Sequence, residues 1–415
     1  MSSGRVDIVF DVTRLFIRAS LNAPTGIDRV TEAYGRWLLS RSDINLTPVC
    51  TWGGYIWTMS VRQLRDILGR EIVDADLDQE RWDRLVAALG ATAPSEDALR
   101  SKSTYHITNR IWDRYVPAIL RTFSGLRSKN VPPGAIYINV SHYGLEQDGV
   151  LERVVRRGWR PVAFVHDLIP IIHPEYCSPV ASKWHRRRIE TIVKNAALVI
   201  ANSNNTAEEL ATFAKNSGRQ APRVLVAPLG VEDRFIQANS TPISTRPYFV
   251  VVGTLEPRKN LTMLFSVWRR LAEEMGDETP NLVLIGQRGW ESEAIIDHLE
   301  RSPPVRRFVH EANGLRDDQV IQLAQGARAL LAPSFKEGFD LPVREARALG
   351  TPVIASAIPI HREVAPDAQL IDPLDGPAWA EAIKQATADG GPRHRTVARG
   401  WAEHFALVSP EIESC

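Results

Sequence analysis

Two glutamates, Glu337 and Glu345, stand on either side of the segment GFDLPVR, so seven residues separate them. Pro342 suits the first position of a helix, and Gly350 suits the left-handed position just past a helix end. The pattern therefore predicts a helix of about two turns whose first turn carries Glu345. The backbone amides of 338–341 at the positive end of this helix favour an anion or sugar hydroxyls, and the carboxylates accept hydroxyl protons.

A pair of adjacent cations, Arg258 and Lys259, occurs in the segment VVGTLEPRKNL at 251–261. The pair follows a strand-like run and a turn, and Asn260 opens the next helical pattern. Arginine offers a planar fork to phosphate oxygens and lysine a compact charge, so the pair suits a nucleoside diphosphate leaving group. The alternative is a pair of surface cations. In the diphosphate site as well, we expect the lysine to be exposed and to contribute little to stability.

Two residues of the first half, Gly26 and His166, could also bind a ligand. Gly26 lies in NAPTGIDRV, where the backbone could approach a ligand closely, although Thr25 and Asp28 also fit a plain helix cap. His166 ends the buried run PVAFV, at the carboxyl end of an expected strand. A lone histidine is more often structural than functional. His142 and His173 are weaker candidates.

The elements that must position these residues alternate between apolar strands and amphipathic helices, which indicates parallel sheets. In the first half we expect strands at 6–12, 135–140, 161–165, 198–201 and 224–227, and a helix from Ile27 to about Leu39. In the second half we expect strands at 248–253, 281–286, 306–311, 327–334, 351–356 and 368–372. Because parallel strands end at one edge, the candidate residues should gather at the carboxyl edges of the sheets.

The polar composition of residues 236–247 predicts a linker between two domains. We expect an N-terminal Rossmann-like domain at 1–240 and a C-terminal one at 241–394. A helical insertion at about 60–130 should lie on the first domain. Residues 395–415 are the candidate for a helix that crosses back to the N-terminal domain.

Composition excludes several classes of protein. The 415 residues include 50 basic and 49 acidic side chains, a net charge of +1 that argues against a dedicated nucleic-acid binder. Three scattered cysteines fit neither a disulfide framework nor a zinc site. Neither a dinucleotide-binding G-x-G-x-x-G nor a P-loop follows a strand. Asp74 and Asp76 form a D-x-D pair, but within the expected insertion, so we read them as solvated charge and expect no metal site.

The segments EGFDLPVRE and ARALGTPVIAS resemble the E-x7-E motif of retaining glycosyltransferase family 4, and the resemblance covers nearly the whole chain. It implies an α/β, GT-B fold: two facing Rossmann-like domains with an interdomain cleft. It also implies that Glu337 lies by the donor sugar, that Glu345 binds the ribose hydroxyls, and that Arg258 and Lys259 bind the diphosphate. His166, in the HDLIP-like segment, would bind the sugar.

The same resemblance implies further substrate-binding residues. These are Gly26, Thr254, Gly338, Phe339, Asp340 and Leu341. Two of them depart from the family pattern, because Thr254 stands where many relatives have arginine and Asp340 where many have glycine. The segment GQRGW at 286–290 is similar to a glycine turn near the base and ribose.

The implied function is that of a bacterial hexosyltransferase of polysaccharide biosynthesis. TLEPRKN and HDLIP look like segments of mannosyltransferases, which makes GDP-mannose the preferred donor, with UDP-glucose and dTDP-rhamnose as alternatives. A catalytically silent nucleotide-sugar-binding subunit is the alternative from another class. A glycosidase is disfavoured, because the second glutamate follows a loop of anion-binding amides and does not face the first across a bond.

We expect transfer without a metal or other cofactor, with the nucleotide sugar as a substrate. The expected partners are this donor and a saccharide or lipid-linked saccharide acceptor, and not nucleic acid. No apolar run approaches the ~20 residues of a membrane span, and the N-terminus runs straight into a strand. We expect a cytoplasmic protein. The basic run His185 to Arg188 leaves contact with the inner membrane surface open.

Overall fold

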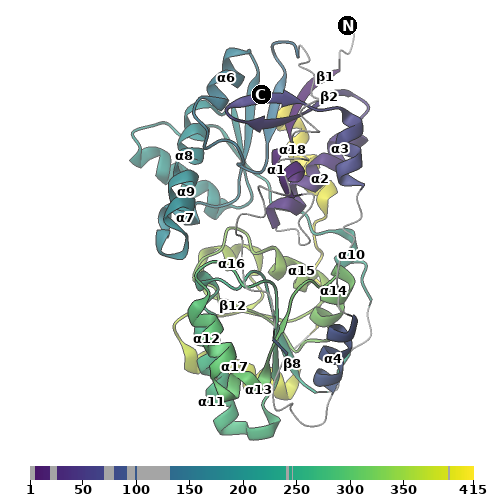
Figure 1. Cartoon of the computed structure of the whole chain (residues 1–415), viewed down its shortest axis with the longest axis vertical. Coiled ribbons are helices and arrows are strands. Elements are labelled where there is room, and N and C mark those ends of the chain that lie inside the picture. Colours follow the sequence, from purple (N-terminus) through teal and green to yellow (C-terminus); the bar gives the residue numbers. More distant parts are fainter. Residues whose placement is uncertain are drawn as a thin grey trace. The chain divides into compact units, whose positions relative to one another are not determined.

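The computed structural model describes residues 5–18, 26–69, 79–90, 99–100, 131–239, 243–244, 246–390 and 393–415. The chain forms two compact units, each with its own sheet and core (Figure 1). The first unit comprises Met1–Val73, His106–Gly230 and Trp401–Cys415. The second comprises Asp74–Tyr105 and Val231–Gly400.

The first unit is built on a seven-stranded sheet with the order β3-β2-β1-β4-β5-β6-β7. The strands are β1 Val6–Asp11, β2 Ile44–Trp52, β3 Tyr55–Thr58, β4 Ile136–Asn139, β5 Arg160–Val165, β6 Leu198–Ala201 and β7 Val224–Val226. All neighbours are parallel except β2 and β3, which form an antiparallel edge. The central strands are buried along their length, as expected for a sheet covered on both faces.

Helices cover both faces of this sheet. They are α1 Thr13–Arg18, α2 Gly26–Ser40, α3 Val61–Leu68, α6 Val150–Arg156, α7 Ile169–Ile172, α8 Pro179–Asn195, α9 Asn204–Asn216 and α18 Trp401–Glu413, with a 3-10 turn at Pro174–Tyr176. Leu151, Ile189 and Phe213 belong to the core between the sheet and α6, α8 and α9. This core fixes the carboxyl ends of β4 and β5, where His142 and His166 lie.

The C-terminal helix α18 packs on α2, so the last residues of the chain belong to the first unit. The rings of Trp37 and Phe405 stack with centroids 4.4 Å apart, and the Tyr34 hydroxyl lies 2.9 Å from Nε2 of His404. Pro410 lies inside this helix without ending it. The segment of residues 395–415 is therefore long enough to build one packed helix.

The second unit is built on a six-stranded, fully parallel sheet with the order β10-β9-β8-β11-β12-β13. Its strands are β8 Tyr248–Val252, β9 Asn281–Ile285, β10 Val309–Ala312, β11 Leu330–Ala332, β12 Val353–Ser356 and β13 Gln369–Ile371. The predicted strand at 306–311 is displaced, because its first residues end the helix α13, Pro303–Phe308. The other five strands lie where the sequence predicts them.

The remaining elements of this unit form two helical layers (Figure 1). They are α4 Gln79–Gly90, α10 Asp233–Ile236, η2 Pro257–Lys259, α11 Leu261–Met275, η3 Gly276–Glu278, α12 Glu293–Arg301, α14 Asp317–Gly326, α15 Leu341–Leu349, α16 Pro359–Val364 and α17 Gly376–Asp389. The main core packs α11, α12, α13 and α17 against one face, and a smaller cluster joins α10, α14 and α15. Helices thus pack on both faces of the sheet, and they hold in place the edge that carries the candidate site.

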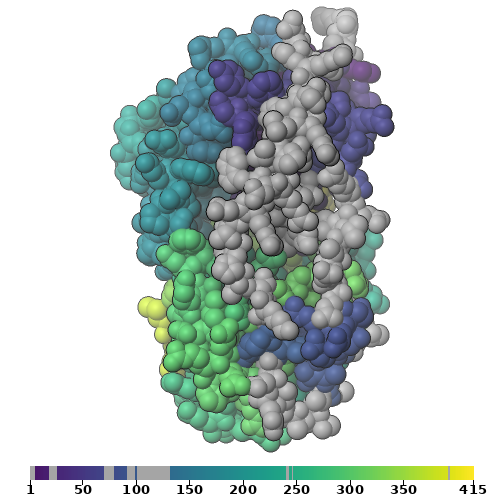
Figure 2. Space-filling view, in the orientation of Figure 1, coloured from purple at the N-terminus to yellow at the C-terminus, as the bar shows by residue number. Residues whose placement is uncertain are grey.

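The insertion and the linker differ from the sequence-based expectation. Helix α4 belongs to the second unit and not to the first; Figure 2 shows it as a dark blue patch on the green surface of that unit. Its Leu89 carbonyl accepts a hydrogen bond from Ser244, and Arg100 donates to the Leu299 carbonyl over 2.7 Å. The chain passes between the units at 230/231 and 400/401, before the predicted linker and after the predicted domain end. Sequence patterns miss such long-range pairings.

Candidate active site

Arg258 and Lys259 are placed by η2, a single 3-10 turn that follows the carboxyl end of β8. The turn ends at Asn260, which adopts a left-handed conformation with φ 55° and begins α11. The Asn260 amide donates to the carbonyls of Pro333 and Pro373 over 3.2 and 2.8 Å. The bond to Pro333 ties the basic turn to the end of β11, and therefore to the loop that carries Glu337, and the bond to Pro373 ties it to the segment after β13.

Glu337 joins both cations. Its Oε2 lies 2.5 Å from Nη1 of Arg258, and its Oε1 lies 2.7 Å from Nζ of Lys259 and accepts a hydrogen bond of 2.7 Å from the Ser334 hydroxyl. Burial raises the pKa of the Glu337 carboxyl, but the charges of Arg258 and Lys259 lower it more, so the net pKa lies well below the usual range. Glu337 is therefore ionised near neutral pH.

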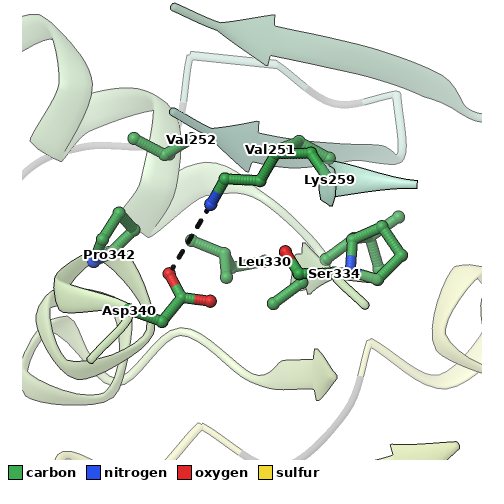
Figure 3. A pocket seen from close by; sticks show the side chains of 10 residues that line it. Val251, Val252, Lys259, Leu330, Ser334, Asp340 and Pro342 are labelled. Atoms are coloured by element: carbon green, nitrogen blue, oxygen red, sulfur yellow. Dashed lines mark ion pairs between the residues drawn. The ribbon is translucent and has the colours of Figure 1, made fainter. Parts of the chain in front are cut away.

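Lys259 is buried, with 7% of its surface exposed, and this corrects the expectation of an exposed lysine. Figure 3 shows its side chain reaching toward Asp340 within a pocket that also includes Val251, Ser334 and Pro342. Nζ of Lys259 lies 4.0 Å from Oδ1 of Asp340. A buried ammonium needs compensating charge, so Lys259 and the two carboxylates form one electrostatic unit.

The loop before α15 and the first residue of that helix carry four further residues that the sequence predicts to bind substrate, from Gly338 to Leu341. Asp340 precedes the helix with φ 57°, a conformation that non-glycine residues seldom adopt. Phe339 and Leu341 are buried, whereas Gly338 is partly exposed. At this end of α15, Pro342 has no N–H group and the Val343 N–H donates to the Asp340 carbonyl over 3.1 Å, so it is mainly the positive end of the helix dipole that favours an anion or hydroxyl oxygens.

Glu345 is the fifth residue of α15, one position beyond the first turn where we expected it, and is buried with 6% of its surface exposed. Thr254 is partly buried and directly follows Gly253, the first residue after β8. Gly286, at the end of β9, approaches this turn so closely that an added Cβ would lie 2.0 Å from the Gly253 carbonyl oxygen. Position 286 therefore requires a glycine, because the turn after β9 passes close to the turn after β8 there.

The GQRGW segment has a structural role that the sequence did not reveal. The Arg288 guanidinium forms two hydrogen bonds of 2.9 Å with the Glu311 carboxylate and a third of 2.9 Å with Glu300. It is buried, with 4% of its surface exposed. This cation holds β10 and α12 against the turn that follows β9.

The structure adds one residue that sequence analysis did not single out. His361, in α16, has no exposed surface, and its Nε2 donates to Oδ2 of Asp340 over 2.9 Å. Its Nδ1 donates to the carbonyl of Ser356 over 2.9 Å. Its position five residues after the end of the predicted strand at 351–356 was the available signal, since that strand ends at the same sheet edge.

His166 and Gly26 lie in the first unit. His166 is buried at the end of β5 and donates from Nε2 to the Val140 carbonyl over 2.7 Å. Gly26 is the exposed first residue of α2, and an added Cβ would meet no described atom within 4 Å, so nothing in the described neighbourhood requires glycine there. Thr25, its proposed cap, and Asp74 and Asp76 lie outside the described residues.

The two weaker histidine candidates separate in the structure. His142 adopts φ 60°, and its ring centroid lies 5.2 Å from that of His166 and 5.4 Å from that of His185. Within the described parts of the chain, its Nε2 is buried with no hydrogen-bond partner. His173 is part of neither contact and bonds Glu175 over 3.1 Å. The buried cluster of His142, His166 and His185 is thus a neutral group at the edge of the first sheet.

Buried histidines make stability sensitive to acid. Burial lowers the pKa of His166 and of His404 to about 4 and that of His310 to about 3, whereas the unfolded chain protonates near 6.5. The unfolded state therefore binds more protons as pH falls. From pH 7 to 5 the free energy of unfolding should fall by about 2 kcal/mol per such histidine. Urea unfolding at both pH values measures this.

A control variant, His404→Gln, removes one of these groups and should reduce the pH dependence accordingly. His361 acts in the opposite direction, because its raised pKa favours the folded state at low pH. Equal free energies of unfolding at pH 7 and 5 would contradict the prediction.

Across the described ranges of the chain, no three or more His, Cys, Asp and Glu side chains are grouped so that they could hold a metal ion. None of the described helices combines the length and apolar character needed to cross a membrane.

Residues 233–401 match the family described as Glycosyl transferases group 1. The chain is 29% identical over 254 residues to the O-antigen chain mannosyltransferase B of Escherichia coli, an alignment that covers 59% of this chain and 65% of that protein. It is 28% identical over 217 residues to the Escherichia coli serotype-specific mannosyltransferase WbdA, covering 48% of this chain and 26% of that protein. The chain thus spans less than two thirds of either relative.

The solved structure of sucrose-phosphate synthase from Thermosynechococcus elongatus matches 99% of this chain and 97% of its own, with a TM-score of 0.60 and 16% identity. This likeness confirms the predicted fold class, an α/β chain of the GT-B type with two largely parallel sheets. The basic turn, Glu337 and α15 all lie within the matched segment of the family. Residues 233–401 of this chain are therefore similar to the group 1 glycosyl transferases.

Proposed function

We propose that this chain is a retaining glycosyltransferase that moves mannose from GDP-mannose to a saccharide or lipid-linked saccharide in polysaccharide biosynthesis. The observation that carries the proposal is the convergence of Arg258 and Lys259 on Glu337, beside the first turn of α15. Two cations next to helix-end amides suit a diphosphate, and a carboxylate beside them suits a sugar hydroxyl. The likeness to two mannosyltransferases supports the choice of sugar.

In the proposed reaction the bond between the anomeric carbon and the diphosphate oxygen breaks, and a bond from the acceptor oxygen to the same carbon forms. Arg258 and Lys259 turn from Glu337 to the diphosphate and stabilise the charge that it gains. The acceptor proton leaves with the diphosphate or reaches solvent. Glu337 faces the sugar where positive charge develops, and Glu345 accepts hydrogen bonds from the ribose hydroxyls.

The other predicted residues bind the substrates in this proposal. The loop of Gly338, Phe339, Asp340 and Leu341 receives the donor sugar, Thr254 lies beside the diphosphate, and Gly26 and His166 come from the first unit. We place the reaction in the cytoplasm, with the acceptor at the inner membrane surface if it is lipid-linked.

The test uses the purified full chain. Thermal shift against GDP-, UDP- and dTDP-sugars should show the largest stabilisation with GDP-mannose, because a ligand stabilises the state that binds it. Incubation with an α-linked donor and lipid-linked acceptor from a bacterial membrane extract should then yield an α-glycoside by NMR. A β-glycoside would exclude retention, preference for UDP-glucose or dTDP-rhamnose would change the donor, and donor binding without turnover would indicate a binding subunit.

Transfer should not depend on a divalent cation. Arg258, Lys259 and the positive end of α15 can together stabilise the diphosphate charge, a task that a metal performs in other transferases. Full activity in EDTA is the expected result, measured with the same donor and acceptor. Activity lost in EDTA and restored by manganese would contradict it.

A further inference from the structure

The pair formed by His361 and Asp340 has a geometry that fixes its protons. Nδ1 of His361 faces the Ser356 carbonyl at 2.9 Å and Nε2 faces the Asp340 carboxylate at 2.9 Å. A carbonyl and a carboxylate both accept, so both ring nitrogens carry hydrogen. The pair is therefore an imidazolium and a carboxylate, with no net charge.

Both members are deeply buried. His361 has no exposed surface and Asp340 has 6%. Burial lowers the pKa of His361, but the hydrogen bond and charge of Asp340 raise it above its usual value overall. Removing either partner would leave the other as an uncompensated buried charge.

The pair also decides what Lys259 faces. Glu337 contacts Nζ of Lys259 at 2.7 Å, whereas Asp340, already held by His361, stays 4.0 Å away. Without His361, the Asp340 carboxylate would pair with the nearest cation, which is Lys259. The ammonium of Lys259 would then be shared by Glu337 and Asp340. A diphosphate would then compete with both of them.

We propose that His361 is a positioning residue that neutralises Asp340 and so keeps Lys259 available to the diphosphate of the donor. The proposal rests on the proposed function, because it assumes that Lys259 binds a diphosphate. Among the residues that the structure describes, the ring nitrogens of His361 bond Asp340 and the Ser356 carbonyl, and His361 acts on the ligand through the lysine.

The experiment is a titration of GDP into the wild-type chain, His361→Gln, Asp340→Asn and the double variant. GDP lacks the sugar, so the titration reports the diphosphate contacts and not the sugar contacts of the loop. The His361→Gln variant should bind GDP about 10- to 100-fold more weakly, the scale of one charge-assisted interaction. The double variant should regain most of this affinity, because the carboxylate that competes for Lys259 is gone.

Each outcome decides one point. If the wild-type chain binds neither GDP, UDP nor dTDP, the proposed function fails independently of this inference. If the wild-type chain binds and His361→Gln binds equally well, or the double variant stays as weak as His361→Gln, the inference is overturned. If His361→Gln does not fold, Asp340→Asn and the double variant should bind GDP equally, and unequal binding overturns the inference.

Discussion

Lys259→Ala is expected to lower the rate of sugar transfer by about 100- to 1,000-fold, the scale of losing one preorganised charge-stabilising group. Nζ of this residue lies 2.7 Å from Glu337, and Asn260 ties the turn that carries it to β11, so the backbone that presents the charge is held in place before the donor arrives. The loss should fall mainly on turnover, because negative charge on the diphosphate grows in the transition state. Steady-state kinetics with varied donor measure it.

Folding must be measured beside activity, because Lys259 is buried and its removal leaves Glu337 with one cation fewer. We expect a lower melting temperature but a folded protein, since Arg258 still pairs with Glu337. Arg301→Ala is the matched control: this cation of the same unit is exposed and its guanidinium lies 3.6 Å from Asp297, so kcat should not change. Unchanged turnover in Lys259→Ala would show that the assigned diphosphate site is wrong.

Glu337→Gln should lower kcat by about 100-fold and also reduce stability. The glutamine amide is uncharged, so it cannot stabilise the positive charge that develops on the sugar. It also cannot pair with both cations. Because Glu337 is 5% exposed and pairs with Arg258 and Lys259, its neutralisation leaves two partly uncompensated cations. We expect the free energy of unfolding of the second unit to fall by about 3 kcal/mol. Kinetics and urea unfolding test the two effects separately.

The matched variant is Glu345→Gln, eight residues along the same segment. Its carboxylate is assigned to the ribose hydroxyls, so its loss should raise the donor KM and leave kcat nearly unchanged, as expected for an interaction present before and in the transition state. If both variants change the donor KM equally, the division of roles between the two glutamates is incorrect.

The sequence by itself determined most strands of both sheets, although not β2 and β3, and the edge at which the chemistry lies. Apolar runs bounded by turns predicted β8, β9, β11, β12 and β13, and local helix signals at Pro342 and Gly350 predicted α15. These features depend on neighbouring residues, and a short window of sequence contains their cause. The candidate residues Arg258, Lys259 and Glu337 followed from the same short windows.

The tertiary structure decided how those residues are used. Lys259 and Glu337 are 78 positions apart in the sequence, and only the parallel order β8-β11 brings their loops together, burying a lysine that the sequence left on the surface. The contact of Asp340 with His361, the attachment of α4 to the second unit and the antiparallel edge β2-β3 are long-range in the same way. Such contacts depend on which segments the fold places side by side, and no local pattern of residues encodes that choice.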